Sequence, residues 1–135
     1  MYTPTLLKKL VTILSFGIIF SLTSVSFLSA ASLSIISDKS IVNLNDVFVT
    51  TVYVNSQGVA INNAEGDLTF PADLLQVQSI STADSVFTIW VEQPSFSNTA
   101  GTVSFNGGVP NPGFNGTTGK LFRVIFKAIK AGTVP

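Results

Sequence analysis

The sequence predicts an all-β protein, folded as a two-layer antiparallel β-sandwich with jelly-roll or immunoglobulin-like topology. Two observations lead to this fold class. After Ala31 the apolar residues show no helical periodicity and instead form short runs rich in β-branched and aromatic side chains. Gly, Pro, Asn, Asp and Ser separate these runs, of which there are about seven, and this spacing is typical of sandwiches.

Residues 1–31 precede this pattern and have the composition of an export signal. Lys8-Lys9 form a short basic region, an uncharged and mostly apolar run follows, and Ser29 and Ala31 supply the small side chains that signal peptidase needs. The alternative is an uncleaved membrane anchor, because the uncharged stretch is long enough to span a bilayer. Either alternative predicts a secreted or cell-surface domain formed by residues 32–135.

Three strands are expected in the first half of this domain. The first is Ser32–Ser37, and the second is Asp46–Asn55, whose sequence DVFVTTVYVN is partly apolar on both faces and therefore predicts a central strand. The third, Ala64–Phe70, alternates strictly, so one face meets the core and the other meets water or a partner. The expected inward residues are Ala64, Gly66, Leu68 and Phe70, and the expected outward residues are Glu65, Asp67 and Thr69.

Further strands are expected after Pro71, which ends the third run because proline cannot donate to a sheet ladder. A tight turn leads to an alternating run with Leu75, Val77 and Ser79 on one face. The later strands are Phe87–Val91, Thr102–Phe105 and Lys120–Ala128. Their expected inward residues include Val103, Phe105, Phe122, Val124, Phe126 and Ala128, with Arg123 and Lys127 on the outward face.

The segment Phe105–Phe126 is rich in Gly, Pro and Asn. Gly107-Gly108 are expected to end a strand, while Pro110 and Pro112 prevent regular ladder pairing and stiffen the crossing. No phosphate-loop spacing leads into a helix. We therefore interpret the segment as a shaped connection between two core strands.

The end of the sequence suggests an incomplete domain. Gly132 marks a turn, and Thr133-Val134 have the character of a strand that is just beginning. The final strand of a sandwich commonly pairs near the first. Its absence would leave an unpaired edge and an open side to the core.

The composition argues against catalysis and against nucleic-acid binding. The chain has no His and no Cys, which removes the commonest general base, the thiol nucleophile and most transition-metal sites. Without the two lysines of the signal, acidic residues outnumber basic ones, so no basic patch for nucleic acid is expected. Glu65 and Asp67 could form a carboxylate pair of the kind that glycosidases use, but acids on an exposed strand face are usually solvated polar residues. The sequence therefore predicts a protein that is not an enzyme.

Calcium is the one metal that the sequence leaves open, and no other cofactor is expected. Asn and Asp also satisfy their own backbones in turns, so turn chemistry is the alternative interpretation, and neither oxygen-rich stretch has the spacing of a known calcium loop. The two stretches consist of Asn43, Asn45 and Asp46, and of Asn62, Asn63, Glu65 and Asp67.

Trp90 and Tyr53 raise the question of carbohydrate binding, because exposed aromatic rings stack on sugars. If Phe87, Ile89 and Val91 face the core, alternation turns Trp90 outward, where it could serve a ligand. Otherwise Trp90 belongs to the core, which is the commoner place for a large aromatic residue in a strand.

Taken together, the stretches DVFVTTVYVN, GVAINNAEGDLTFPADLLQVQSI, GTVSFNGG and GKLFRVIFKA, in this order, resemble the cohesin domain. Cohesins are jelly-roll modules of bacterial scaffolding proteins that bind the dockerin modules of cellulosomal enzymes. The resemblance implies a dockerin-like partner and a link to polysaccharide breakdown. It places the contacting Asn and acid of the cohesin family on Asn63 and Glu65, with Asp67 next on the same face. This chain has FPAD where cohesins usually have a Tyr-Asp-Pro turn.

Three functions therefore stay open at this stage. The first is a cohesin-type protein–protein interaction module that acts through Asn63, Glu65 and Asp67. The second is a carbohydrate-binding module that uses Trp90 or Tyr53 on a surface polysaccharide. The third is a structural, immunoglobulin-like spacer of a surface protein. A membrane would be involved only through an uncleaved N-terminal segment.

Overall fold

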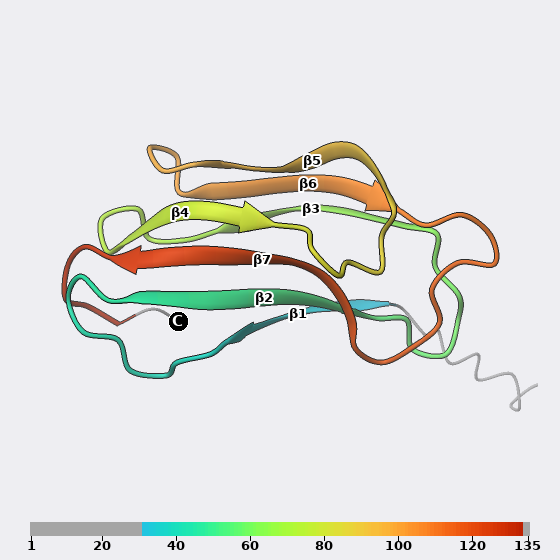
Figure 1. The fold of residues 1–135 in the computed structure, drawn as a ribbon, viewed down its shortest axis with the longest axis horizontal. Helices are drawn as coiled ribbons and strands as arrows, with labels where there is room; N and C mark the ends of the chain where they lie inside the picture. The colour runs from blue at the N-terminus through green and yellow to red at the C-terminus, as the bar shows by residue number, and fades with distance from the viewer. Residues whose placement is uncertain (1–30, 134–135) are drawn as a thin grey trace, which may run out of the picture.

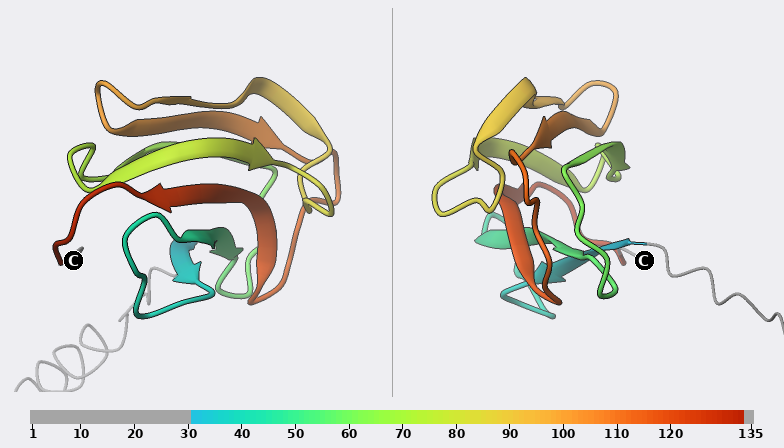
Figure 2. Two further views of the ribbon diagram at one scale, coloured as in Figure 1. Left: turned by 60° about the vertical axis from the view of Figure 1, so that its left-hand side comes forward. Right: turned by 90° about the vertical axis from the view of Figure 1, so that its right-hand side faces the viewer.

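Seven strands form two sheets that pack face to face (Figures 1 and 2). The computed structural model describes residues 31–133, so the predicted export signal or anchor lies outside the described residues except for Ala31. Within the described part of the chain, no helix is long and apolar enough to cross a membrane. The strands are β1 (Ser32–Ser37), β2 (Val47–Asn55), β3 (Asn63–Thr69), β4 (Leu75–Ser81), β5 (Ile89–Ser97), β6 (Thr102–Gly108) and β7 (Gly119–Ala128).

The two sheets are antiparallel throughout. One has the strand order β1-β2-β7-β4 and the other has the order β3-β6-β5. The predicted all-β, two-layer sandwich is confirmed. β2 lies between β1 and β7, as its two-sided apolar sequence predicted.

The core lies between the sheets and is formed mainly by alternate residues of β2, β6 and β7. The Phe105 ring of β6 meets the Phe122 ring of β7 edge-on, with the two centroids 5.0 Å apart, so this contact joins the two layers. Each large apolar side chain that leaves water in this way contributes about 1.5–3 kcal/mol to the free energy of folding. The inward residues predicted on the later strands are all buried, namely Val103, Phe105, Phe122, Val124, Phe126 and Ala128.

β4 departs from its predicted alternation. Leu75 and Val77 are buried as expected, but a bulge falls between Val77 and Ser79 in the pairing with β7. The extra residue of a bulge reverses the phase of the strand, so Ser79 is exposed and Ile80 packs against the core. The prediction that Ser79 continues the inward row is wrong for this reason.

β5 begins two residues later than predicted and runs further. It extends beyond the predicted end at Val91 to Ser97, passing through Pro94. Proline is tolerated here because β5 is an edge strand with two irregularities in its pairing with β6. β6 likewise continues past Phe105 to Gly108.

The Gly- and Pro-rich connection between β6 and β7 is fixed to the segment before β3. Ile61 and Phe114 exchange two backbone hydrogen bonds of 2.9 and 2.8 Å, and the Val109 amide donates to the Asn62 carbonyl at 2.8 Å. Gly113, with φ of 86°, adopts the left-handed conformation that favours glycine. The interpretation as a shaped connection is confirmed.

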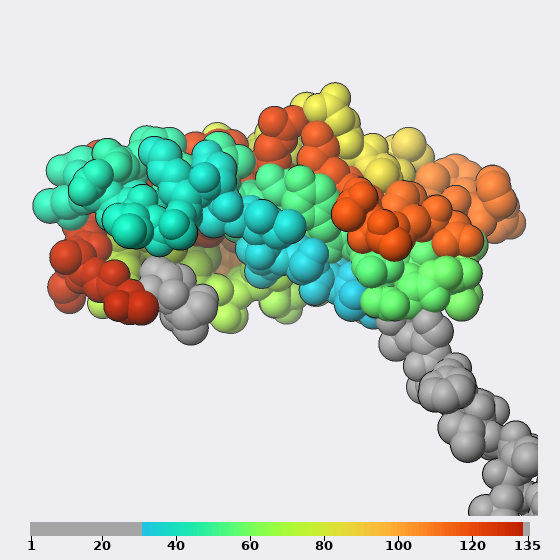
Figure 3. Space-filling model, turned by 90° about the horizontal axis from the view of Figure 1, so that it is seen from below, coloured from blue at the N-terminus to red at the C-terminus, as the bar shows by residue number. Residues whose placement is uncertain are grey.

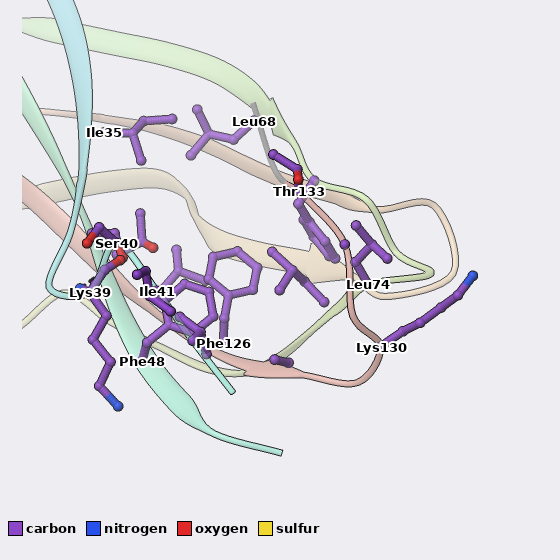
Figure 4. Close-up of a pocket in the computed structure, with 18 of the residues that line it drawn as sticks. Ile35, Lys39, Ser40, Ile41, Phe48, Leu68, Leu74, Phe126, Lys130 and Thr133 are labelled. Carbon is purple, nitrogen blue, oxygen red and sulfur yellow. Dashed lines mark hydrogen bonds between the residues drawn. The ribbon is translucent and has the colours of Figure 1, made fainter. Parts of the chain in front are cut away.

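One side of the core is open. A cleft of about 680 Å³ lies between the sheets, and the free edges of β1 and β3 contribute Ile35 and Leu68 to its lining (Figure 4). The lining also includes Phe48 and Phe126. Figure 3 shows that β1 lies at the surface of this side of the molecule. The prediction that a final strand is missing concerns residues after Thr133, which lie outside the described residues, so it stays a prediction.

Candidate functional site

The outer face of β3 presents the three polar side chains singled out in the sequence. Asn63, Glu65 and Asp67 are exposed, while the residues between them are half-buried against the core. This alternation follows from the two-residue period of a strand and was predicted from the sequence. The three residues therefore form one row on the solvent side of the three-stranded sheet.

Neighbouring side chains of β6 orient the two acids of this row. Glu65 lies opposite Asn106 in the register and accepts a hydrogen bond of 2.8 Å from its Nδ2 atom. Asp67 lies opposite Ser104 and accepts a hydrogen bond from its hydroxyl group. Because these contacts restrict the acidic side chains before any partner arrives, less rotamer entropy is lost on binding.

Asn63 has a different environment. Gly108 lies opposite it on β6, and Ile89 lies opposite Gly108 on β5. Ile89 and Val91 are 53% and 80% exposed. The end of the face near Asn63 therefore combines an amide with exposed aliphatic surface.

The same face is negatively charged. Glu92 of β5 lies opposite Asn106 and adds a third acid to Glu65 and Asp67. The ion pairs found within residues 31–133 all involve Asp73 or Asp84, so none of them neutralises this face. A partner with basic or hydrogen-bond-donating groups would complement it.

Sequence reasoning identified the β3 row but not its neighbours on the same sheet. Ser104 and Asn106 alternate with the correctly predicted inward residues of β6, so the same period contained the signal that places them outward. Glu92 and Val91 could not be placed in this way, because irregularities in the pairing of β5 interrupt its alternation.

Trp90 is packed rather than presented. It is half-buried, and its ring lies 5.9 Å from the Phe87 ring and 6.4 Å from the Phe122 ring, measured between centroids. The outward alternative required Ile89 and Val91 to face the core, whereas both are exposed. Trp90 therefore packs against the core, which is the second of the two interpretations that the sequence left open.

Tyr53 lies on the outer face of the other sheet. It is half-buried and lies opposite Ser34 of β1 and Lys120 of β7. Because Trp90 points between the sheets and Tyr53 points away from them, the two aromatic residues do not form one sugar-stacking platform.

The first oxygen-rich stretch has the hydrogen bonds of a turn. The Oδ2 atom of Asp46 accepts hydrogen bonds of 3.1 Å from both the backbone amide and the Nδ2 atom of Asn43. These hydrogen bonds lower the pKa of Asp46 below its ordinary value of 3.8. Asn45 adopts a left-handed conformation with φ of 71°.

The second stretch is divided between two environments. Asn62 donates through Nδ2 to the Val109 carbonyl at 3.1 Å and to Oδ1 of Asn111 at 3.2 Å, whereas Glu65 and Asp67 contact β6. Within residues 31–133, no group of three or more His, Cys, Asp or Glu side chains converges. Calcium binding stays a prediction that nothing in the structure tests.

The arrangement of strands and faces defines the chain first as a jelly-roll-type β-sandwich and, more narrowly, as a protein with the cohesin fold. A type II cohesin domain from the cellulosome of Acetivibrio cellulolyticus is similar with a TM-score of 0.58 and 15% identity, covering 78% of this chain and 72% of that chain. A chain of an interface mutant of a type II cohesin–X–dockerin complex from the same organism is similar with a TM-score of 0.54 and 14% identity, covering 77% of this chain and 74% of that chain. No family model and no curated protein matches the sequence. The resemblance found in the sequence is confirmed at the level of the fold.

Proposed function

We propose that this chain is a non-catalytic, exported interaction module that binds a dockerin-like protein module through the outer face of β3, β6 and β5. The observation that carries the proposal is the exposed row of Asn63, Glu65 and Asp67, whose two acids are oriented by β6. Similarity to a cohesin that is part of a cohesin–dockerin complex supports this class of partner.

The chemistry of the face supports binding over catalysis. Glu65 and Asp67 lie on an exposed sheet face, and neither of them lines the apolar cleft. Enzyme sites are usually concave and exclude water around the reacting groups. The absence of His and Cys from the whole sequence removes the commonest general base and the thiol nucleophile.

Location outside the cytoplasm and a connection to polysaccharide breakdown are part of the same proposal. The basic and apolar composition of the N-terminal segment supports export. The cellulosomal origin of a similar cohesin domain supports the connection to polysaccharides.

The proposal is tested by the double substitution Asn63→Ala with Glu65→Ala. A panel of purified dockerin modules, including the one from the Acetivibrio cellulolyticus complex, is screened by surface plasmon resonance, and a module that binds is then titrated against the variant. We expect the double variant to bind at least about tenfold more weakly, as is typical when central contacts of an interface are removed. The melting temperature should not change, because both side chains are exposed.

The matched control is Gln76→Ala with Gln78→Ala, which removes two exposed polar side chains from β4 in the other sheet. It should leave binding unchanged. Equal binding by the parent chain and the Asn63/Glu65 variant would show that the partner uses another surface.

The fluorescence of Trp90 separates the carbohydrate alternative from the proposed function. A packed Trp90 should give blue-shifted emission that soluble glucans do not quench, since its ring contacts Phe87 and Phe122. Quenching by glucans would instead support a carbohydrate-binding module. A spacer would bind neither glucans nor any dockerin module.

A further inference from the structure

The outer faces of the two sheets carry charges of opposite sign. The face of β3, β6 and β5 presents the acids Glu65, Asp67 and Glu92. On the other side of the sandwich, the residues of β7 that point away from the core form a cationic row (Figures 1 and 2). The cations of this row are Lys120, Arg123 and Lys127.

The cationic row follows a central strand. β7 lies between β2 and β4, so the row is flanked by a strand on each side. At a strand rise of about 3.3 Å per residue, Arg123 lies about 10 Å from Lys120 and about 13 Å from Lys127. Separate charges in a line on a flat sheet complement an extended polyanion whose own charges are widely spaced. Duplex DNA carries one charge per about 1.7 Å, which is far denser than this row.

Two members of the cationic row already hold a carboxylate. Oδ2 of Asp84 accepts hydrogen bonds of 3.1 Å from Lys120 Nζ and 3.0 Å from Arg123 Nη2. Asp84 reaches them from the connection between β4 and β5, with a φ of 59°, and its side chain is 77% exposed. An ion pair exposed to this extent contributes little to stability, so another carboxylate can displace Asp84 at small cost.

Asp84 does not satisfy Arg123 completely. The Nε atom of Arg123 is buried and has no hydrogen-bond partner among the described residues. Buried polar groups are usually hydrogen-bonded. The guanidinium group therefore has donor capacity beyond its bond to Asp84.

Hydroxyl groups and one aromatic ring surround the two cations that hold Asp84. Tyr53 of β2 lies opposite Lys120, while Thr51 of β2 and Ser81 of β4 flank Arg123. Opposed residues of an antiparallel pair share a face, so these side chains lie beside the cations. Hydroxyl groups donate and accept hydrogen bonds, and the half-buried Tyr53 presents part of its ring. Carboxylates, hydroxyl groups and apolar ring faces occur together in acidic polysaccharides.

We propose that the outer face of β7, β2 and β4 binds an acidic polysaccharide. Carboxylates of the polymer pair with Lys120, Arg123 and Lys127, and a sugar ring lies on Tyr53. Asp84 occupies part of the site until a carboxylate of the polymer displaces it. Each exposed charge pair is weak, so binding depends on several units of one polymer engaging the row together.

This site is independent of the proposed dockerin-binding face. The two sites lie on the outer faces of different sheets, so both ligands fit on one molecule (Figures 1 and 2). The variant Asn63→Ala with Glu65→Ala should therefore bind acidic polysaccharides as well as the parent chain does. Failure of the dockerin screen would leave this expectation unchanged.

The first test is isothermal titration calorimetry of the purified chain with polygalacturonate, alginate and hyaluronate. Dextran is the uncharged control. We expect at least one acidic polymer to bind and dextran not to bind. Raising the salt from about 50 to about 300 mM should weaken binding by at least about threefold, because salt screens exposed charge pairs. Poly-L-glutamate, which has carboxylates but no sugar rings, should bind at least about tenfold more weakly than the best polysaccharide.

The second test removes the carboxylate that competes with the polymer. Asp84→Asn should tighten binding by about fivefold, the factor that one unit charge at about 4 Å contributes in water. Asparagine tolerates the left-handed backbone of this position. Asp73→Asn is the matched control, because it removes the same charge from the exposed pair with Lys130, and it should change the affinity by less than about twofold.

The third test removes a cation that forms no ion pair within residues 31–133. Lys127→Ala should weaken binding by about fivefold and leave the melting temperature unchanged. No binding to any of the three acidic polymers would overturn the proposal, as would equal effects of Asp84→Asn and Asp73→Asn. Equal binding of poly-L-glutamate would assign the face to an acidic peptide, and binding only to phosphatidylglycerol vesicles would assign it to a membrane. Either result would also overturn the proposal.

Discussion

The substitution Gly107→Ala tests whether Trp90 is a packed residue of the core. Gly107 lies on the inward face of β6, directly opposite Trp90 of β5. A methyl group at Gly107 would lie 2.5 Å from Cε3 and 2.7 Å from Cζ3 of the indole, and 3.1 Å from the Ile89 carbonyl oxygen. The first two distances are far below van der Waals contact, so the ring or the strand must move.

The expected cost follows from two opposing terms. Overpacking of this kind costs about 1–3 kcal/mol, while the loss of glycine flexibility in the unfolded chain returns about 0.4–1 kcal/mol. We expect a net loss of about 1–2 kcal/mol of unfolding free energy, which lowers the melting temperature by about 4–8 °C per kcal/mol in a domain of this size. Gly66→Ala is the matched control on β3, because its methyl group would lie at an ordinary 3.5 Å from Phe105 Cε1.

The assay is urea unfolding followed by circular dichroism, which does not depend on the tryptophan. Gly66→Ala should be neutral or slightly stabilising. Combining Gly107→Ala with Trp90→Leu should cost less than the sum of the single changes, because the smaller side chain removes the clash. If Gly107→Ala is no more destabilising than Gly66→Ala, Trp90 is free to leave its contacts, and the assignment of this residue to the core is wrong.

Three further predictions concern stability. Asn98→Ala should lower the unfolding free energy by about 1–3 kcal/mol in urea titrations, because the amide and carbonyl of Val77 lose their partner, and a loss below about 0.5 kcal/mol would mean that water replaces it. Phe122→Ala should cost about 3–5 kcal/mol by the same measurement, since Phe122 is 0% exposed, and a surface-like cost would contradict the described core. Asp46 has a lowered pKa because of its hydrogen bonds from Asn43, so its ionised form stabilises the fold above pH 3.8, and this contribution is lost as the pH falls through the folded pKa. The melting temperature should therefore fall more steeply below about pH 4 in the parent than in Asp46→Asn, and parallel curves would refute this role.

Local sequence pattern was sufficient for the faces of regular strands. The alternation of Ala64–Phe70 correctly placed Glu65 and Asp67 outward, and the pattern after Lys120 correctly placed Phe122 inward. These predictions succeed because successive side chains of an extended backbone point to opposite faces, whatever strand lies beside them.

The same reasoning failed where pairing with another strand breaks the period. Ser79 was wrongly predicted because a bulge in the pairing with β7 shifts the phase of β4. β5 was predicted to end too early because only the sheet order shows that it is an edge strand, in which Pro94 is tolerated. A bulge depends on the residue opposite, which a single run of sequence does not specify.

The sequence by itself therefore determined an all-β sandwich, its cohesin resemblance and the outward row of Asn63, Glu65 and Asp67. Only the tertiary structure decided that Ser104 and Asn106 orient this row and that Trp90 packs against Phe87 and Phe122. The reason is physical: the direction of a side chain is set by its own backbone, whereas hydrogen-bond partners, packing and open edges are set by which strands become neighbours.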